Sequence, residues 1–414
     1  MADLRPLTPE DATRGFELGP IRPPSEAMSL LVRVIRNCTW NRCTFCPVYK
    51  GTKAWQRELE DVLADVDAMA AVAEVLRDKG WAAAGVVREK GRGSQGSARL
   101  LRAGELPRES YQVELFLRAG AKTVFLQDAD PCAVKPEKLA AVIARVKERF
   151  PTVERVTTYG RARTLARRAP EQLRLLREAG LTRVHLGLES GCDEVLRAMD
   201  KGVTADELIA AGTKVLGSGM ELCFYLMPGL GGRAAAAEHV AGSARVIRAV
   251  AAAPAEDGSS AYGTGAAPDN PLVVRLRTAA VVPGTPLAER EAAGDFELPD
   301  DVEVVQEIRD VLEQAGEARF ELRSDHALNL LPELEGSLPA DRDRLLAVLD
   351  EYLALPRADQ AAFAVGARLG VFRRLADLQD EGRRRAFEAR LSGYRQPSPD
   401  ELLAAARDLR SRFI

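Results

Sequence analysis

Three cysteines stand close together near the start of the chain, in the segment CTWNRCTFC, at Cys38, Cys43 and Cys46. They are half of the six cysteines among 414 residues. The preceding residues 29–36 are largely apolar and alternate like a strand, so we expect the thiols on a loop that follows a strand. A structural zinc site needs four protein ligands, and no fourth cysteine or histidine lies nearby in the sequence. Three thiols suit an iron–sulfur cluster with one iron open to a further ligand.

Two other interpretations of these cysteines stay open at this point. The spacing also occurs in plant-type two-iron ferredoxins, which need a fourth cysteine downstream, but no cysteine stands between Cys46 and Cys132. Free cysteine is also often a small buried hydrophobic residue. Against this, Asn41, Arg42 and Thr44 make the loop polar. We therefore favour the open cluster.

The composition excludes several broad classes of protein. Hydrophobic residues make up 46% and charged residues 29%, an ordinary balance for a folded protein with a large core. The formal net charge is −3, which gives no electrostatic reason to expect a nucleic acid partner. No apolar run approaches the roughly 20 residues of a membrane span, and the first residues lack the apolar segment of a signal peptide. Clustered cysteines in such a chain indicate metal or redox use in a reducing cytoplasm.

Strands and helices are expected to alternate along most of the chain. Amphipathic helical patterns separate six segments of strand composition, at 29–36, 122–127, 154–158, 183–188, 221–227 and 272–280. This alternation predicts an α/β fold with a parallel sheet, and six units fit a partial (β/α)6 barrel. We expect an N-terminal arm at 1–28, the barrel at 29–316 with loop insertions at 80–108 and 251–270, and a helical C-terminal extension at 317–414.

One glycine-rich segment has a second interpretation. Residues 91–96 read GRGSQG and match G-x-G-x-x-G. A dinucleotide-binding fingerprint needs a strand before it and a helix that opens within it. The preceding residues form a weak strand and are followed by the charged triplet 88–90. We favour a surface loop.

The cysteine loop resembles that of the radical SAM (S-adenosylmethionine) superfamily, whose members bind a [4Fe–4S] cluster. The usual spacing there is C-x3-C-x2-C with an aromatic residue before the last cysteine, and Phe45 precedes Cys46 here. The first gap, residues 39–42, is one residue longer than usual. The resemblance implies that Cys38, Cys43 and Cys46 hold the cluster and that its open iron binds SAM.

The ends of later strands carry the same resemblance. The second strand ends in Asp128-Ala129-Asp130-Pro131, where the family has Gly-Gly-Glu-Pro. The resemblance therefore implies that this stretch, with Asp130 as the acid, holds the amino group of SAM. An Asx turn after a strand is the plain alternative.

Two further strand ends complete the set of expected SAM contacts. The fourth strand ends in GLESG, which implies a contact at Glu189 beside Ser190, with a solvated glutamate as the alternative. The fifth ends in MPGLGG, which implies that the backbone at Pro228 and Gly229 passes close to SAM. Strand ends are where barrels of this kind carry their chemistry.

The resemblance implies a reaction type but no substrate. An electron from an external reductant such as flavodoxin or ferredoxin would cleave SAM, and the 5′-deoxyadenosyl radical would abstract hydrogen from a small molecule in an oxygen-sensitive reaction. A tetrapyrrole oxidative decarboxylase-like enzyme is an alternative by barrel type alone. A SAM- or haem-binding iron–sulfur protein without turnover, such as an electron carrier, is another.

Strand alternation gives an expectation about the substrate. Residues two apart share a face, so a Glu189 that faces the barrel lumen places His185 there, deeper in the barrel. Leu276 suits the helix-packed outer face, which turns Arg275 and Arg277 into the lumen. A buried arginine needs an acid. One interpretation is an anionic substrate held at Arg277, with His185 as a second catalytic candidate. The alternatives are that protein carboxylates satisfy both arginines, or that the strand register is off by one and both arginines face outward.

The remaining cysteines, Cys132, Cys192 and Cys223, are expected to be small buried residues. Return of a hydrogen atom to a substrate radical is the alternative for them. In the C-terminal extension, residues 324–331 read SDHALNLL, and no role follows from the sequence.

Overall fold

One curved sheet of eight strands organises the part of the chain that the computed structural model describes, which is residues 5–78, 105–253, 271–392 and 397–413. Along the sheet the strands are β1 (Leu30–Arg33), β4 (Thr123–Gln127), β5 (Arg155–Gly160), β6 (Leu181–Glu189), β7 (Glu221–Leu226), β8 (Leu272–Leu276), β9 (Phe320–Arg323) and β10 (Gly336–Leu338). Neighbours are parallel from β1 to β9, and β10 is antiparallel to β9. The predicted α/β fold is confirmed, and the six predicted strands are β1 and β4 to β8.

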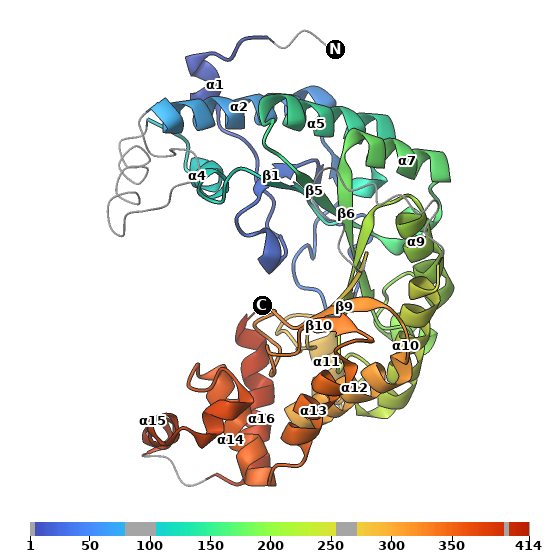
Figure 1. Cartoon of the computed structure of the whole chain (residues 1–414), viewed down its shortest axis with the longest axis vertical. Coiled ribbons are helices and arrows are strands. Elements are labelled where there is room, and N and C mark those ends of the chain that lie inside the picture. Colours follow the sequence, from blue (N-terminus) through green and yellow to red (C-terminus); the bar gives the residue numbers. More distant parts are fainter. Residues whose placement is uncertain (1–4, 79–104, 254–270, 393–396, 414) are drawn as a thin grey trace.

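Helices cover the outer side of the curved sheet, and the strands line its inner side (Figure 1). The helices of the arm and barrel are α1 (Pro9–Arg14), α2 (Leu59–Asp78), α4 (Ser110–Arg118), α5 (Pro136–Arg149), α6 (Ala162–Ala166), α7 (Pro170–Ala179), α8 (Asp193–Ala198), α9 (Ala205–Gly217), α10 (Ala236–Ala251), α11 (Pro286–Ala292) and α12 (Asp301–Ala315). Local chemistry sets several ends: the Thr204 and Asp300 side chains cap α9 and α12, and Gly180 ends α7 in the left-handed region. Among the described helices, none is long and apolar enough to cross a membrane.

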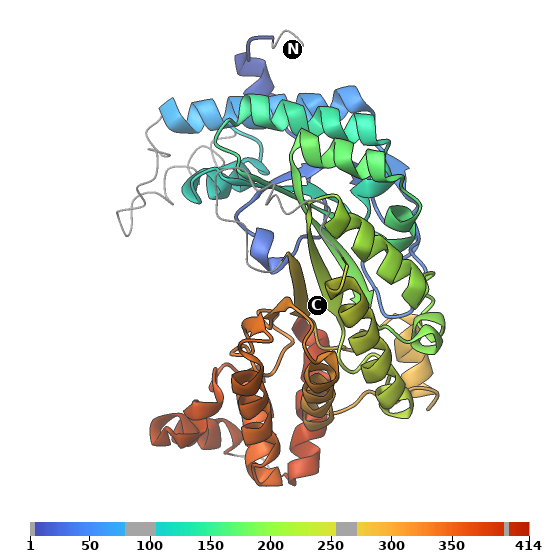
Figure 2. The ribbon, with the colours of Figure 1, turned by 45° about the vertical axis from the view of Figure 1, so that its right-hand side comes forward.

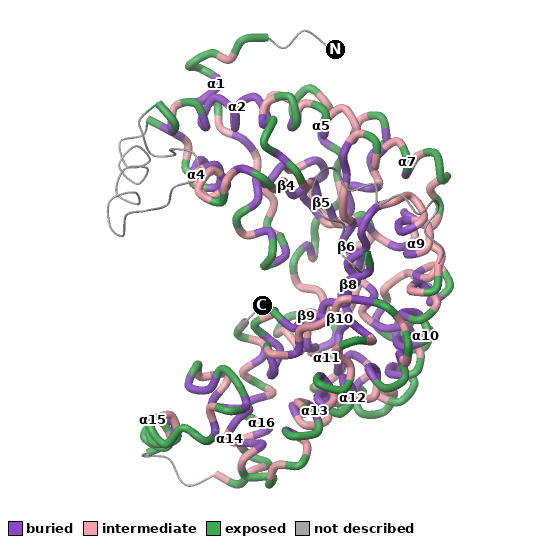
Figure 3. The backbone as a smooth tube through the Cα atoms, in the orientation of Figure 1, coloured by how far each residue is buried: buried purple, intermediate pink, exposed green. Residues whose placement is uncertain are grey.

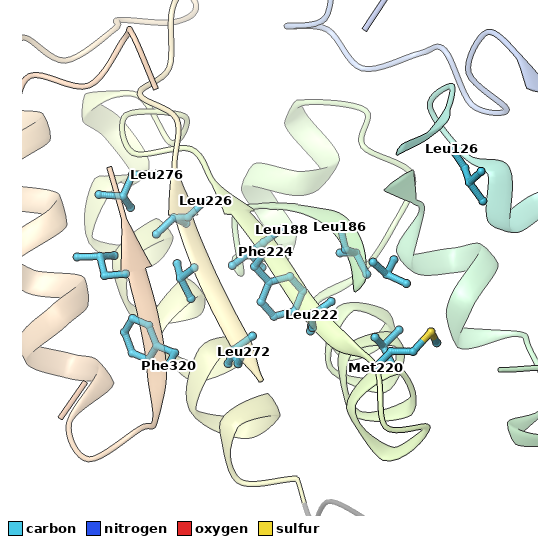
Figure 4. Packing of buried hydrophobic residues seen from close by; sticks show 14 of the residues in the cluster. Leu126, Leu186, Leu188, Met220, Leu222, Phe224, Leu226, Leu272, Leu276 and Phe320 are labelled. Atoms are coloured by element: carbon cyan, nitrogen blue, oxygen red, sulfur yellow. The ribbon is translucent and has the colours of Figure 1, made fainter. Parts of the chain in front are cut away.

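The two faces of the sheet have different partners. Leu222, Phe224 and Leu226 of β7 belong to the large core between the strands and the helices (Figure 4). The alternate residues Cys223 and Tyr225 belong to a small separate cluster on the opposite face. We call this opposite, concave side the lumen face. The strands are buried along most of their length (Figure 3).

The N-terminal arm and the C-terminal extension both contribute to the barrel. The arm carries the short 3-10 helix η1 (Pro24–Glu26), whose Glu26 is fully buried. The predicted helical C-terminal extension is present as α13 to α16, and two strands at its start, β9 and β10, continue the sheet. β9 pairs in parallel with β8, which extends the barrel beyond residue 316. The predicted loop insertions, including residues 91–96, lie outside the described residues except at 105–108 and 251–253.

The last part of the chain is helical and packs against the end of the barrel (Figure 2). Its helices are α13 (Arg342–Leu353), α14 (Arg357–Arg368), α15 (Glu381–Leu391) and α16 (Pro399–Leu409). A buried ion cluster ties it to α12: the Asp301 carboxylate lies 2.8 Å from the Arg368 guanidinium and 3.1 Å from that of Arg410. Each of these side chains is almost fully shielded from water.

The turn after β6 and helix α10 touch through two glycines. A Cβ on Gly191 would lie 2.2 Å from the carbonyl oxygen of Gly242, and a Cβ on Gly242 would lie 2.5 Å from that of Gly191. Both contacts are with backbone, so neither can be relieved by rotation of a side chain. α10 can therefore approach the end of β6 only with glycine at both positions.

We predict that Gly242→Ala lowers the free energy of unfolding by roughly 1–3 kcal/mol, the usual cost of overpacking. Gly217→Ala is the matched control, because nothing lies within 4 Å of its added Cβ. It should be neutral or stabilise by about 0.4–1 kcal/mol. Urea unfolding of both variants measures this, and equal stability of the two would contradict the proposed close contact.

Candidate active site

The cysteine loop joins two short antiparallel strands, β2 (Ile35–Arg36) and β3 (Trp55–Gln56). Cys38, Cys43 and Cys46 are all free thiols of intermediate exposure. The Asn41 amide N–H points at the Cys38 sulfur at 3.4 Å, and the Cys46 amide donates to the Cys43 carbonyl at 3.3 Å. These hydrogen bonds stabilise a loop conformation in which the three cysteines remain partly exposed.

This donor set fits a [4Fe–4S] cluster. The three thiols are close enough that charges at Cys38 and Cys46 affect the pKa of Cys43. Among the described residues, no three His, Cys, Asp or Glu side chains converge on a single metal ion. A cubane cluster does not require such convergence, because each thiolate binds a different iron and the sulfurs surround the cluster. Three free thiols on one partly exposed loop meet that need.

Glu189, at the end of β6, faces a lysine. Its carboxylate accepts a 2.7 Å hydrogen bond from the Lys201 Nζ, and its backbone has a φ of 58°. Gly187 makes room for the pair, since a Cβ there would lie 2.1 Å from the Glu189 Oε1. Burial alone would lower the pKa of Lys201, but the charge of Glu189 and its hydrogen bond raise it above its ordinary value. Lys201 is therefore a stable cation between the carboxylate and the cysteine loop.

Burial, Glu189 and Lys201 also change the pKa of the Cys43 thiol. Burial raises its pKa to about 11, with Glu189 adding to the shift and Lys201 opposing it. Without metal this thiol therefore stays protonated near neutral pH. Binding of iron must release the proton, as thiolate ligation does generally.

Asp130, at the end of β4, lies against the cysteine loop. One carboxylate oxygen accepts from the hydroxyls of Thr39 at 2.9 Å and Thr164 at 2.7 Å, and the other accepts from the Arg161 amide at 3.1 Å. Burial raises its pKa to about 6 against these stabilising bonds. Asp130 thus fixes the start of the cysteine loop, and both of its oxygens have protein donors.

The neighbouring Asp128 is fully buried in a different set of contacts. Its carboxylate lies 2.8 Å from the Arg33 guanidinium and also accepts from the Tyr49 hydroxyl. Burial raises the pKa of Asp128 despite these partners. Ala129 between the two acids is partly buried. This strand end therefore offers backbone and Asp130 to the site, while Asp128 has a structural ion pair.

The end of β7 is tied to that of β6. The Met227 amide donates to the Glu189 carbonyl at 3.0 Å, and the Gly229 amide donates to the buried Glu307 carboxylate at 2.7 Å. The Ser190 hydroxyl lies 2.8 Å from the His239 Nδ1. Helices α10 and α12 therefore hold both turns through polar side chains.

The remaining predicted site residues near these turns, Pro228, Gly229 and Phe45, are buried or pack against a small apolar cluster. Pro228 and Gly229 are buried. Phe45 packs against an apolar cluster that includes Cys192, Met199 and Met227. The aromatic residue of the cysteine loop thus touches the elements that end in the β6 and β7 turns.

His185 lies deep on the lumen face. It is fully buried and has ring contacts with Phe125, Tyr159 and Tyr225, at centroid distances of 5.9 to 6.0 Å. Its Nε2 lies 3.8 Å from the Glu26 Oε1 of the arm. Burial would lower the pKa of His185, but its partners, Cys223 first and Glu26 after it, raise it. Nothing in the local sequence of the arm marks Glu26 as a partner of His185.

The two arginines of the sixth predicted strand have different surroundings. Arg275 is buried, and its Nε lies 3.0 Å from the Asp325 Oδ1, so a protein carboxylate satisfies it. Arg277 is half-buried, and its Nε is shielded from water without a hydrogen-bond partner. Among the described residues no carboxylate forms an ion pair with Arg277. The positive charge of Arg277 acts to lower the pKa of Tyr159 and of His326.

The segment 324–331 has a role that its sequence did not indicate. Besides Asp325 at Arg275, the Asn329 side chain accepts from the Thr278 amide at 3.0 Å and donates to the Leu276 carbonyl at 2.9 Å. Asn329 therefore satisfies the backbone where β8 ends.

The three remaining cysteines are all buried. Cys132 belongs to the main core and Cys192 to the small core near Met227, whereas Cys223 lies on the lumen face beside His185. The structure therefore brings the cysteine loop, Asp130 and Glu189 together at one edge of the sheet, with His185 and Arg277 on the lumen face. Sequence reasoning missed Lys201 and Glu307; the lysine stands in the KGVT segment after Glu189, and nothing local marks the glutamate.

A family model described as the radical SAM superfamily matches residues 97–240. The match covers the strand ends at Asp130 and Glu189 and stops short of the cysteine loop. No curated protein matches the sequence.

Solved structures with similar folds include several radical SAM enzymes. Coproporphyrinogen III oxidase (HemN) from Escherichia coli is 13% identical, with 93% of this chain and 89% of that chain covered and a TM-score of 0.42. The cobalamin-dependent SAM radical enzyme OxsB is 15% identical, with 92% and 58% covered and a TM-score of 0.40. Elp3 from the archaeon Methanocaldococcus infernus is 16% identical, with 52% of each chain covered and a TM-score of 0.38. The chain thus spans little more than half of the last two, and we draw nothing further from likenesses at these scores.

We predict a pH-dependent contribution to stability from Glu307. Burial raises its pKa to about 7 from an ordinary value of 4.5. The fold thus favours the protonated acid, so the contribution is complete below about pH 4.5 and is lost as the pH rises through about 7. Between these values the free energy of unfolding of the wild type should fall by at least ~1 kcal/mol relative to Glu307→Gln.

Urea unfolding across this pH range measures the difference. Asp206→Asn changes a carboxylate whose side chain is 90% exposed, and its profile should run parallel to that of the wild type. A Glu307→Gln profile that is also parallel would show that this carboxyl does not titrate differently in the folded protein.

Proposed function

We propose that this chain is a radical SAM enzyme that uses a [4Fe–4S] cluster and SAM, and that it acts on an anionic small molecule held at the lumen face by Arg277. The match of residues 97–240 to the radical SAM family model supports the first part. The observation that carries the proposal is that no described carboxylate forms an ion pair with Arg277, whose Nε is shielded from water without a hydrogen-bond partner, beside a set of strand ends that suit SAM. An external one-electron reductant such as flavodoxin or ferredoxin would serve it.

The residues of the site divide into those for the cluster and those for SAM. Cys38, Cys43 and Cys46 would hold the cluster, and Glu189 and the backbone at Gly229 would position SAM. When bound, the cluster and SAM would supply the one-electron and radical chemistry of hydrogen abstraction. The protein's own part is to exclude water and to hold the substrate within reach.

The lumen face suits this part. Tyr159, which is partly buried, forms an aromatic floor with the buried His185 and Tyr225, so an apolar portion of the substrate would lose its water there. Arg277 would then bind a carboxylate or phosphate, in bidentate fashion where geometry permits. His185 is part of this floor, where its ring nitrogens would hold or accept a proton.

The charge arrangement favours a substrate anion over a protein acid. Leaving a guanidinium partly buried without an acid is costly, and Asp325 is already engaged with Arg275. His326 near Arg277 adds no second cation, because burial and the arginine charge lower its pKa to about 4. A tetrapyrrole with carboxylate side chains is one member of the proposed substrate class.

We predict that anaerobically reconstituted wild-type protein binds about four irons and four sulfides per chain, as a cubane cluster requires. Reduced protein should then form 5′-deoxyadenosine from SAM. The variant with Cys38, Cys43 and Cys46 all changed to Ala should lose both iron and cleavage. The triple Cys132→Ala, Cys192→Ala, Cys223→Ala variant is the control and should keep the iron. Iron retained by the first variant would refute the ligand assignment.

We predict that Arg277→Leu separates SAM cleavage from substrate response. Adding the anionic fraction of a cell metabolite extract should accelerate 5′-deoxyadenosine formation by the wild type, whereas the unretained fraction should not. Arg277→Leu should lose at least tenfold of this acceleration and keep its slow uncoupled cleavage. Arg197→Leu, at an exposed position on α8, should behave as the wild type. Acceleration by the unretained fraction, or loss of uncoupled cleavage in Arg277→Leu, would contradict an anionic substrate at this residue.

A further inference from the structure

The turn between α8 and α9, residues 199–202, is in contact with the cysteine loop along its backbone. The Thr44 amide donates to the Met199 carbonyl at 2.9 Å. The Trp40 indole N–H donates to the Asp200 carbonyl at 2.6 Å, and the Arg42 guanidinium lies 3.0 Å from the Asp200 carboxylate. Every second residue from 40 to 44 therefore has a partner in the 199–202 turn.

Trp40 fills the space between the two segments. Its ring lies under the guanidinium groups of Arg42 and Arg161, 4.9 and 5.1 Å from the ring centroid, which is the geometry of cation–π contacts. Gly202 leaves room for the indole, because a Cβ there would lie 2.3 Å from a ring atom. Gly202 also has a φ of 67°, which disfavours other residues. Trp40 is in the first cysteine gap, the one with four residues.

Lys201 connects the same turn to the SAM side of the site. Its Nζ lies 2.7 Å from the Glu189 carboxylate, and its side chain is only 17% exposed. Its carbonyl accepts from Arg161 at 3.2 Å, so the backbone beneath it is held as well. Its turn is bonded to the cysteine loop at Thr44, the residue after Cys43. The second lysine near this cysteine, Lys50, contacts it differently, through a 2.8 Å hydrogen bond to the backbone carbonyl.

We propose that the 199–202 turn sets the register of the cysteine loop against Glu189, and that Lys201 is a positioning residue whose charge also favours reduction of the bound cluster. This inference rests on the proposed function, because it takes the three cysteines as the cluster ligands. An added electron makes the cluster more negative, and a nearby cation with little access to water stabilises that charge. Without Lys201, the unpaired Glu189 carboxylate would act in the opposite direction.

Lys201→Gln tests the charge with a readout other than turnover. In the reconstituted protein, an EPR-monitored redox titration should show a cluster about tenfold harder to reduce, a shift of ~59 mV to more negative potential for one electron. Iron content should equal that of the wild type. Lys201→Arg keeps the cation and should recover most of the shift.

Arg42→Gln is the matched control for loss of a cation at this loop. The Arg42 side chain is 64% exposed, so water and salt screen its charge and its removal should change the potential far less. A potential of Lys201→Gln equal to that of the wild type, or to that of Arg42→Gln, would overturn the role of Lys201. A wild type that binds no cluster at these cysteines would instead refute the proposed function.

Gly202→Ala tests the register without changing a charge. The added methyl group must displace Trp40, so the loop should loosen and the cluster should be lost to a chelator at least severalfold faster than from the wild type. Trp40→Leu, which removes the indole, should show the same faster loss. Chelation at the wild-type rate in both variants would show that the turn does not hold the loop.

Discussion

The parallel strands of the barrel all end at one edge of the sheet, and the candidate site depends on this constraint. Because parallel neighbours keep the same direction, the segments after β1, β4, β6 and β7 are brought side by side although they are far apart in the chain. The register also aligns Tyr159, His185, Cys223 and Val273 across four strands. Site and lumen floor are thus two consequences of one pairing pattern.

Buried charge is distributed over this scaffold in pairs. Arg33 meets Asp128, Arg275 meets Asp325 and Lys201 meets Glu189. Each pair offsets the loss of hydration that burial imposes on its members. Arg277 stands apart because no carboxylate of the described chain satisfies it in this way. The lumen face therefore carries a positive charge at Arg277 that no described carboxylate of the barrel neutralises.

The sequence predicted the features that depend on local pattern, and missed those that depend on contacts between distant segments. The alternation of strand and helix patterns predicted all six strands, because hydrophobic periodicity follows burial directly. The inward direction of Arg275 and Arg277 followed from the outward fit of Leu276. The partner Asp325 could not be predicted, since it follows a strand, β9, that was taken for helix. Glu26 and Glu307 lie on elements whose own sequences give no reason to place them at the site.

The ion cluster of Asp301 with Arg368 and Arg410 has a consequence for the order of folding during synthesis. α12 leaves the ribosome long before either arginine has been made, so its first residue is then a carboxylate that can be buried only at a high cost in hydration. The outer layer of the barrel therefore cannot close fully at this end until the C-terminal helices arrive. Completion of the barrel and arrival of those helices are in this way one cooperative event, and a chain interrupted before Arg410 would retain an open, water-accessible seam along α12.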